Sequence, residues 1–329
     1  NVHSVFYPQD EGLCTMPVFY LEMRLNPGGV IRRVAPSNVP SAARLMFRIR
    51  RPGTQIEASD RGGGRLDLHY HTELKPDLMP QCGQDRQVEV HERIQSLNPG
   101  TVPDKDGAGL SLELPVTEQD SGVKWRLVWG AYCGESVLEV DNGTGPRPAR
   151  FKYARRFDDL EAVMSQAIEQ RDHSLNYSRR FEKLFDQVPL SSTDKHLIHQ
   201  SFQSFLSNTF WCDLPGDLST PDEWFSVWTG GRLYHGVIDV EYNTCLIYLA
   251  IWPKLLAIQF GQWAAHEKQH EASGGGYLSH DVGRGIQVTG PAYDHDMPVE
   301  ESSDFLLMLQ AYCRWCGDID PASRLADLI

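Results

Sequence analysis

At residues 142–148 the sequence reads Asn142-Gly-Thr-Gly-Pro-Arg-Pro148, and on either side of this stretch the apolar residues follow different periods. Glycine, asparagine and proline at this density predict consecutive turns, because glycine tolerates positive φ angles and proline restricts φ. We therefore place a boundary here and expect two domains, one over residues 1–150 and one over residues 151–329.

Before this boundary, apolar residues alternate with polar ones, so that apolar side chains share one face of each expected strand. Charged residues such as Arg48 and Asp67 fall on the opposite face. The alternating sets are Leu45, Phe47 and Ile49; Leu66, Leu68 and Tyr70; Leu110, Leu112 and Leu114; and Val123, Trp125, Leu127 and Trp129. Short strands at this spacing, separated by turns, predict an antiparallel β-sandwich.

After the boundary, apolar residues recur with the period of one face of an α-helix. The pattern predicts helices with apolar faces over residues 160–168, 197–206, 240–263 and 299–316. Asp158 is placed to cap the first of these, and Gly317 follows the last at the position of a left-handed C-cap. We expect residues from Asp158 onward to be almost entirely helix and loop. Strands followed by helices are typical of the α+β class.

Charge and composition argue against several classes of protein. The net charge of −13 argues against nucleic-acid binding, because neutralising phosphates requires clustered lysine and arginine. The most apolar stretch, residues 244–260, contains Pro253 and Lys254 and is shorter than the roughly 20 apolar residues of a membrane span. Residues 1–16 lack the basic start and apolar run of a secretory signal, so a cytoplasmic location is favoured and no membrane partner is expected.

Two segments after the boundary, residues 224–243 and 273–301, combine aromatic residues, carboxylates and glycines beyond what a helical core requires. A sugar site needs aromatic faces for the apolar side of the ring, carboxylates for the hydroxyls and a pair of acids to break the glycosidic bond. Both segments supply these groups at expected helix ends. The candidate binding residues are Trp228, Tyr234, Asp239, His280 and Asp281.

Each candidate also has a purely structural interpretation. Asp239 precedes a strongly apolar helix and could cap it, His280 and Asp281 could stabilise a turn, and Trp228 and Tyr234 could be core residues. A metal site is not expected, since adjacent ligands project in different directions and no His-x-x-x-His helical spacing is present. No cofactor is expected, because the glycine-rich run of the second segment lacks the Lys-Ser/Thr of a phosphate loop.

These segments resemble known enzyme families. Residues 234–253, in which Asp239-Val240 enters a long apolar helix, are similar to the corresponding stretch of glycoside hydrolase families 116 and 52. The stretch His280-Asp281-Val282-Gly283 and the helix that follows it resemble the His-Asp-Leu/Met-Gly segment of the same families. The stretch Met297-Pro298-Val299-Glu300-Glu301-Ser302 is similar to the fungal glutaminase A group, which shares the helical architecture.

The resemblance implies a β-sandwich packed on an (α/α)₆ helical toroid, of which this chain would hold the first part. A missing C-terminal half or a partner chain would then complete the toroid. It also implies that Asp239, His280 and Asp281 bind hydroxyls of the sugar, and we expect the Asp239 carboxylate and the His280 ring to line one cavity, with Trp228 or Tyr234 as a wall. In these families a nucleophilic glutamate stands shortly before the aspartate, where this chain has Trp228-Thr-Gly-Gly. A covalent intermediate requires a carboxylate there.

The leading hypothesis is a glycoside hydrolase that acts on a neutral, β-linked sugar. If hydrolysis proceeds with inversion, Glu223, Glu241 or Glu300 would activate water, and the general acid would lie outside this chain. Two alternatives stay open: a glutaminase-like amide hydrolase, and a carbohydrate-binding protein without catalytic activity.

Overall fold

The computed structural model describes residues 1–24, 42–49, 57–60, 64–74, 86–104, 110–117, 124–215, 222–269 and 275–327. Its α-helices are α1 (Glu11–Cys14), α2 (Leu160–Glu169), α3 (Arg171–Asp186), α4 (Ser192–Ser207), α5 (Ile238–Ile251), α6 (Pro253–Ala264), α7 (Pro298–Cys316) and α8 (Asp320–Arg324). Its longer strands are β2 (Val18–Arg24), β3 (Ala42–Ile49), β5 (Arg65–Leu74), β6 (Arg86–Ser96), β8 (Leu110–Thr117), β9 (Lys124–Tyr132), β10 (Ser136–Val140), β11 (Arg147–Phe151), β12 (Thr209–Leu214) and β13 (Asp222–Val227). The shorter elements are β1 (Val2–Ser4), β4 (Glu57–Asp60), β7 (Val102–Asp104), β14 (Tyr234–His235), β15 (Lys268–Gln269), β16 (Gly276–Tyr277), β17 (Gly283–Arg284), β18 (Gln287–Val288) and the 3₁₀ turns η1 (Lys152–Arg155) and η2 (Gly230–Arg232). Helices and strands are both abundant, so the predicted α+β class is confirmed.

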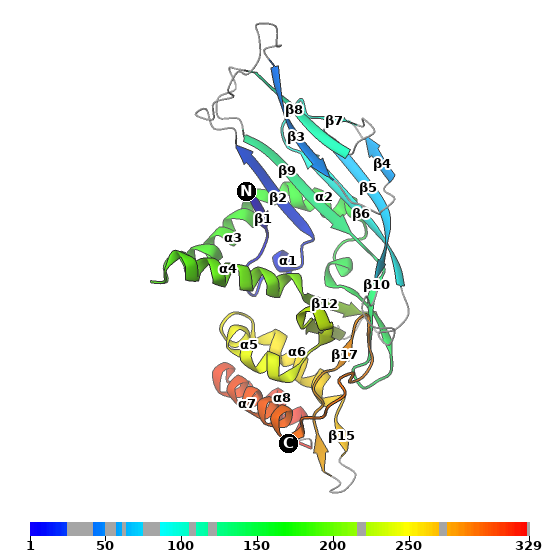
Figure 1. Cartoon of the computed structure of the whole chain (residues 1–329), viewed down its shortest axis with the longest axis vertical. Helices are drawn as coiled ribbons and strands as arrows, with labels where there is room; N and C mark the ends of the chain where they lie inside the picture. The colour runs from blue at the N-terminus through cyan, green and yellow to red at the C-terminus, as the bar shows by residue number, and fades with distance from the viewer. Residues whose placement is uncertain are drawn as a thin grey trace.

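Two antiparallel sheets form the upper part of the molecule in Figure 1. One has the strand order β1-β2-β9-β6-β5-β4 and the other the order β3-β8-β7. They share an apolar core that includes Leu66 and Ile94 of the first sheet and Leu112 of the second. The predicted strands are confirmed as parts of β3, β5, β8 and β9, although Val123 lies outside the described residues. The antiparallel arrangement is confirmed, and the β-sandwich stays a prediction.

The opposite face of the six-stranded sheet is covered by α2. Along β9, Leu127 packs into the core between the sheets and Val128 into a second core beneath α2, as a period of two requires. Val163 and Met164 belong to this second core. Gly130 allows the close approach of α2, because a Cβ at this position would lie 2.5 Å from the sulfur of Met164.

A seven-stranded sheet of order β13-β12-β11-β10-β18-β17-β14 extends across the expected boundary. Its strands β12 and β13 follow α4 and pair in antiparallel fashion, from Thr209 opposite Val227 to Leu214 opposite Asp222. The expectation that the chain after Asp158 is almost entirely helix and loop is therefore wrong. The aromatic residues Trp224 and Phe225, which begin the first candidate segment, are instead buried on opposite faces of a strand, where aromatic side chains pack well. The division at residue 150 stays a prediction.

Helices α5, α6 and α7 pack on this sheet. Their shared core contains Trp224 of β13 together with Phe260, Trp263 and Phe305. The single helix predicted over residues 240–263 is two helices, because Pro253 cannot continue the hydrogen-bond pattern of α5 and instead begins α6.

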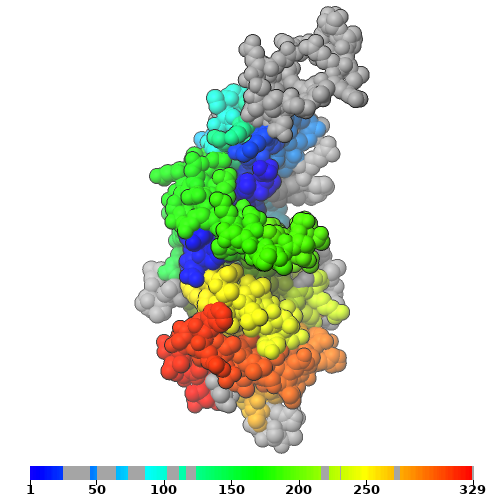
Figure 2. All heavy atoms as spheres, turned by 90° about the vertical axis from the view of Figure 1, so that its left-hand side faces the viewer, coloured from blue at the N-terminus to red at the C-terminus, as the bar shows by residue number. Residues whose placement is uncertain are grey.

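The helix ends follow their expected chemistry with one correction. Asp159, one residue after the predicted Asp158, caps α2 by accepting a hydrogen bond from the Ala162 N–H. Gly317 ends α7 with a φ of 69°, as predicted. Helices α3, α4, α5 and α7 lie along one side of the molecule and the sheets along the other (Figures 1 and 2). This layer is compatible with part of a toroid, but the (α/α)₆ toroid stays a prediction.

Candidate functional site

Three polar side chains from separate parts of the chain meet where α5 and α7 begin. Asp239 lies in the first turn of α5, Glu301 lies in the first turn of α7, and His280 lies on the loop between β16 and β17. One donor atom from each of the three lies within 4.8 Å of the others. The backbone fixes this meeting, because the Ile238 N–H donates to the His280 carbonyl at 3.0 Å and the Asp239 N–H donates to Glu301 Oε2 at 3.1 Å. The predicted proximity of Asp239 and His280 is confirmed, whereas a cavity lined by both stays a prediction.

The Glu301 carboxyl group is the most perturbed member of this cluster. Its side chain is completely buried, at 0 % exposure. Burial, followed by the neighbouring Asp239 carboxylate, raises the pKa of Glu301 to about 8. Among the described residues, Glu301 Oε1 and the buried Asp239 Oδ1 have no hydrogen-bond partner. At neutral pH the Glu301 carboxyl group carries a proton. A hydrogen bond donated from Glu301 Oε1 to Asp239 Oδ1 would give both of these oxygens a partner.

The cluster is bounded on one side by aromatic rings. The His280 imidazole stacks on Tyr293 with 4.2 Å between ring centroids. Tyr234 stands edge-on to both, with its centroid 5.7 Å from each. Two aromatic rings therefore contact His280 on this side of the cluster, and the Arg284 guanidinium lies over the Tyr234 ring, 4.8 Å from its centroid.

Asp281 organises the loop that carries His280. Its carboxylate is buried, with 1 % exposure, and it accepts backbone hydrogen bonds from Gly283, Ala292 and Tyr293 at 2.9–3.0 Å. It also lies 3.2 Å from His280 Nδ1, which orients the imidazole. These contacts favour a positioning role for Asp281, and its predicted contact with sugar stays a prediction.

The two predicted aromatic residues lie in different surroundings. Tyr234 touches the cluster through His280, whereas the Trp228 ring packs on Phe210 at 4.6 Å and against His235 at 5.5 Å. His235 is itself completely buried, and burial lowers its pKa to about 3. The structure thus brings Tyr234 to His280, whereas the half-buried Trp228 contacts Phe210 and His235.

The three predicted catalytic carboxylates do not meet in one place. Glu241 is buried and accepts a hydrogen bond of 2.6 Å from the Tyr248 hydroxyl, and burial raises its pKa to about 7. Glu300 is exposed beside Glu301 in the first turn of α7. Glu223 lies on β13 in an ion-pair network described below. Their catalytic roles stay predictions.

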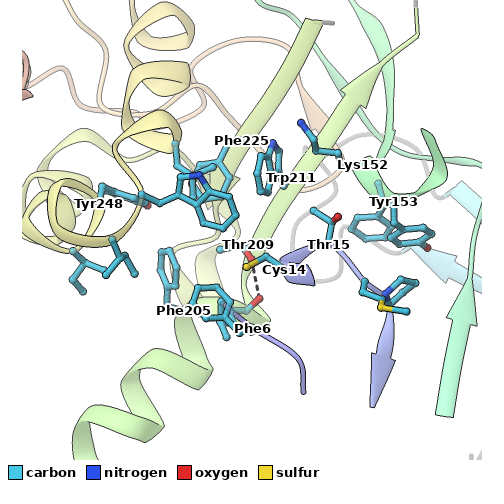
Figure 3. A pocket seen from close by; sticks show the side chains of 18 residues that line it. Phe6, Cys14, Thr15, Lys152, Tyr153, Phe205, Thr209, Trp211, Phe225 and Tyr248 are labelled. Atoms are coloured by element: carbon cyan, nitrogen blue, oxygen red, sulfur yellow. Dashed lines mark hydrogen bonds between the residues drawn. The ribbon is translucent and has the colours of Figure 1, made fainter. Parts of the chain in front are cut away.

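A cavity of ≈ 230 Å³ lies away from the cluster, between the N-terminal segment, α4, α5 and the start of α6. Its walls combine aromatic residues, such as Phe6, Phe205 and Trp211, with aliphatic ones, and Lys152 lies at one edge (Figure 3). Asp239, His280 and Glu301 are not among the residues that line it.

Glu223 adjoins this cavity through Lys152 and Trp211. The Lys152 ammonium lies 2.6 Å from Glu223 Oε1, and Lys254 lies 3.2 Å from the same oxygen. The Trp211 indole N–H donates to Glu223 Oε2 at 3.1 Å. Burial alone would raise the pKa of Glu223, but the hydrogen bond and charge of Lys152 outweigh burial and lower it. A carboxylate held ionised by two ammonium groups is a weak proton acceptor, so this environment is that of a structural ion pair.

Glu301 is the site residue that the sequence interpretation did not select. The sequence offered two adjacent glutamates in the first turn of α7, and the resemblance drew attention to both. Glu300 was chosen, but the rotation of α7 turns Glu301 inward. The donor set of Asp239, His280 and Glu301 could also share a divalent cation. The expectation of no metal stays a prediction.

Comparison with known proteins finds a match to a family of glycosidases. Residues 139–220 match the family model of glycosyl hydrolase family 52. The match runs from β10 to just beyond β12 and covers well under half of the chain, and it supports a glycosidase-like relationship at the level of the family. It lies before the segments that carry Asp239, His280 and Glu301, so it assigns no role to them. The resemblances to family 116 and to the glutaminase A group stay predictions. No curated protein matches the chain.

Among the residues that the structure describes, no helix combines the length and apolar character that crossing a membrane requires.

Proposed function

We propose that the chain contributes a sugar-binding site to a glycoside hydrolase that acts on a neutral, β-linked sugar. In this proposal Asp239 and His280 bind sugar hydroxyls and Tyr234 packs beside the ring. The observation that carries it is the meeting of two carboxyl groups and an imidazole within 4.8 Å, next to stacked aromatic rings. The match to glycosyl hydrolase family 52 supports the same class of reaction.

Glu301 holds Asp239 in place. With a pKa raised to about 8, Glu301 is protonated at neutral pH and its O–H can donate to Asp239. The other Asp239 oxygen, Oδ2, is then left for a ligand. The carboxyl oxygens of this pair lie within 4.8 Å, closer than the roughly 6.5–9.5 Å between the two acids of an inverting glycosidase. We therefore assign the pair to binding and keep the exposed Glu300 as the candidate base.

The proposed architecture is a β-sandwich followed by part of an (α/α)₆ toroid, with further helices covering α5 and α7. Large apolar side chains on these helices are exposed: Leu246 by 70 %, Leu307 by 49 % and Trp315 by 66 %. Apolar surface of this kind usually has a neighbour in the complete assembly.

The test is calorimetric titration of the full chain with glucose, galactose and xylose, together with Asp239→Asn. A carboxylate that accepts hydroxyl hydrogen bonds contributes about 1.5–3 kcal/mol per bond, so the variant should bind at least about tenfold more weakly. Asp304→Asn is the matched control, because it removes the same charge from α7 near Asp239. Equal weakening by both variants, or no binding of any sugar to the wild type, would contradict the proposal.

Turnover separates the alternatives. Release of nitrophenol from aryl β-glycosides supports the hydrolase, whereas hydrolysis of glutamine in its place supports the amide hydrolase. Sugar binding without turnover of either substrate supports the alternative of a carbohydrate-binding protein without catalytic activity.

A further inference from the structure

A second group of metal-ligating side chains lies far from α5 and α7, on paired strands of the six-stranded sheet. In the antiparallel register of β5 and β6, His69 lies opposite His91 and His71 lies opposite Glu89. Residues that alternate along a strand share a face, so these four side chains form a two-by-two square on one face. Leu66, Leu68 and Tyr70 point to the other face, so the square is not part of the core between the sheets.

The side chains in this square already converge on one another. His69 Nε2 lies 2.5 Å from Glu89 Oε1, and His91 Nε2 lies 3.5 Å from the same oxygen. The two imidazole rings are stacked, with centroids 4.7 Å apart and an interplanar angle of 3°. The donor atoms of all three residues lie within 4.8 Å of one another. Two imidazole nitrogens and a carboxylate oxygen therefore lie close together, with the nitrogen lone pairs of the stacked rings in parallel planes.

We propose that His69, Glu89 and His91 bind a divalent transition-metal ion, with Zn²⁺ the best match. Zn²⁺ takes imidazole nitrogen and carboxylate oxygen at about 2.0–2.2 Å, which separates tetrahedral ligands by about 3.4 Å. Because the two rings are parallel, at least one of them must rotate before both nitrogens can point at one ion. Exposures of 35 %, 42 % and 41 % leave room for this rotation. Two nitrogen donors disfavour Ca²⁺ and Mg²⁺, which prefer oxygen ligands.

The fourth position is open to His71 or to water. The His71 ring lies 5.7 Å from that of His69, and its strand partner is Glu89. A bound ion would join β5 to β6 through side chains in addition to the backbone ladder. This site does not depend on the proposed function, because it lies on the six-stranded sheet whereas Asp239 lies on α5.

The test is calorimetric titration of the full chain with Zn²⁺ after treatment with a chelator. His91→Ala and Glu89→Gln should each weaken binding of one equivalent by at least about tenfold, since even partners outside the first ligand shell contribute 10–100-fold to metal affinity. His173→Ala is the matched control, because it removes an exposed histidine from α3.

Two further variants exclude other zinc ligands on this chain. Glu301→Gln alters the Asp239 cluster, and the double change Cys313→Ser with Cys316→Ser removes the two thiols at the end of α7. Neither variant should change the binding of the one equivalent of Zn²⁺ that His91→Ala weakens. The proposal is overturned if the wild type binds no Zn²⁺ or if His91→Ala binds Zn²⁺ as tightly as the wild type. It is also overturned if the equivalent of Zn²⁺ is lost in Glu301→Gln or in the double cysteine variant.

Discussion

Replacing Glu301 by glutamine should change how the stability of the protein depends on pH. The pKa of Glu301 is about 8 in the folded protein, against 4.5 for an ordinary glutamate, because burial and the Asp239 carboxylate disfavour its ionised form. The folded state therefore holds a proton between pH 4.5 and pH 8 that the unfolded state releases. The contribution of Glu301 to the free energy of unfolding is fully present below pH 4.5 and is lost as the pH rises towards 8.

The size of this pH effect follows from the difference between the pKa values of Glu301 in the folded and unfolded states. In this window the free energy of unfolding falls by about 1.4 kcal/mol per pH unit, which amounts to several kcal/mol by pH 8. Glutamine has the shape of the protonated side chain and does not titrate. The variant should therefore gain stability relative to the wild type as the pH rises from 5 to 8, and the difference should level off above pH 8.

The assay is urea unfolding of both proteins at pH 5, 6, 7, 8 and 9 with a chelator present, since a bound cation would hold Glu301 ionised. Subtracting the free energy of unfolding of the wild type from that of the variant at each pH cancels the contributions of other titrating groups such as His235 and Glu241. Glu300→Gln serves as the control, because it removes a carboxylate from the same turn of α7 at an exposed position. A difference for Glu301→Gln that does not vary between pH 5 and pH 9 would refute the reasoning.

Three further outcomes are expected. Lys152→Met should lower the free energy of unfolding by at least about 2 kcal/mol, since it removes the nearest cation from the half-buried Glu223, and adding Glu223→Gln should restore part of the loss in urea unfolding. Gly283→Ala should destabilise the protein far more than Gly290→Ala in the same assay, because both have φ near 150° (+147° and +155°) but only the first would place a Cβ 2.6 Å from the Val288 backbone. The isolated chain should associate through the apolar surfaces of α5 and α7, and sedimentation that shows a stable, monodisperse monomer would contradict this.

The local sequence pattern was sufficient to predict those helices and strands whose apolar residues have a clear period and whose ends carry a clear signal. Alternation at Leu66 and Leu68 identified β5, and the apolar spacing before Gly317 identified α7 with its left-handed cap, because each signal depends only on neighbours in the chain. The same reasoning missed β12 and β13. Aromatic residues such as Trp224 serve equally well in a strand or a binding loop, and only the pairing of β13 with β12, and of β12 with β11, decides between them.

At the candidate site, the sequence by itself determined which chemical groups are present and that Asp239 and His280 stand at helix or loop ends. It did not determine which of the two glutamates at the start of α7 faces inward, since both occupy the same turn. That choice follows from the rotation at which α7 packs its Phe305 face against α6, which turns Glu301 towards Asp239 and leaves Glu300 in solvent. The raised pKa of Glu301 likewise arises only in the folded protein, because burial and the nearness of Asp239, 62 positions earlier in the chain, exist only after α5 and α7 have packed.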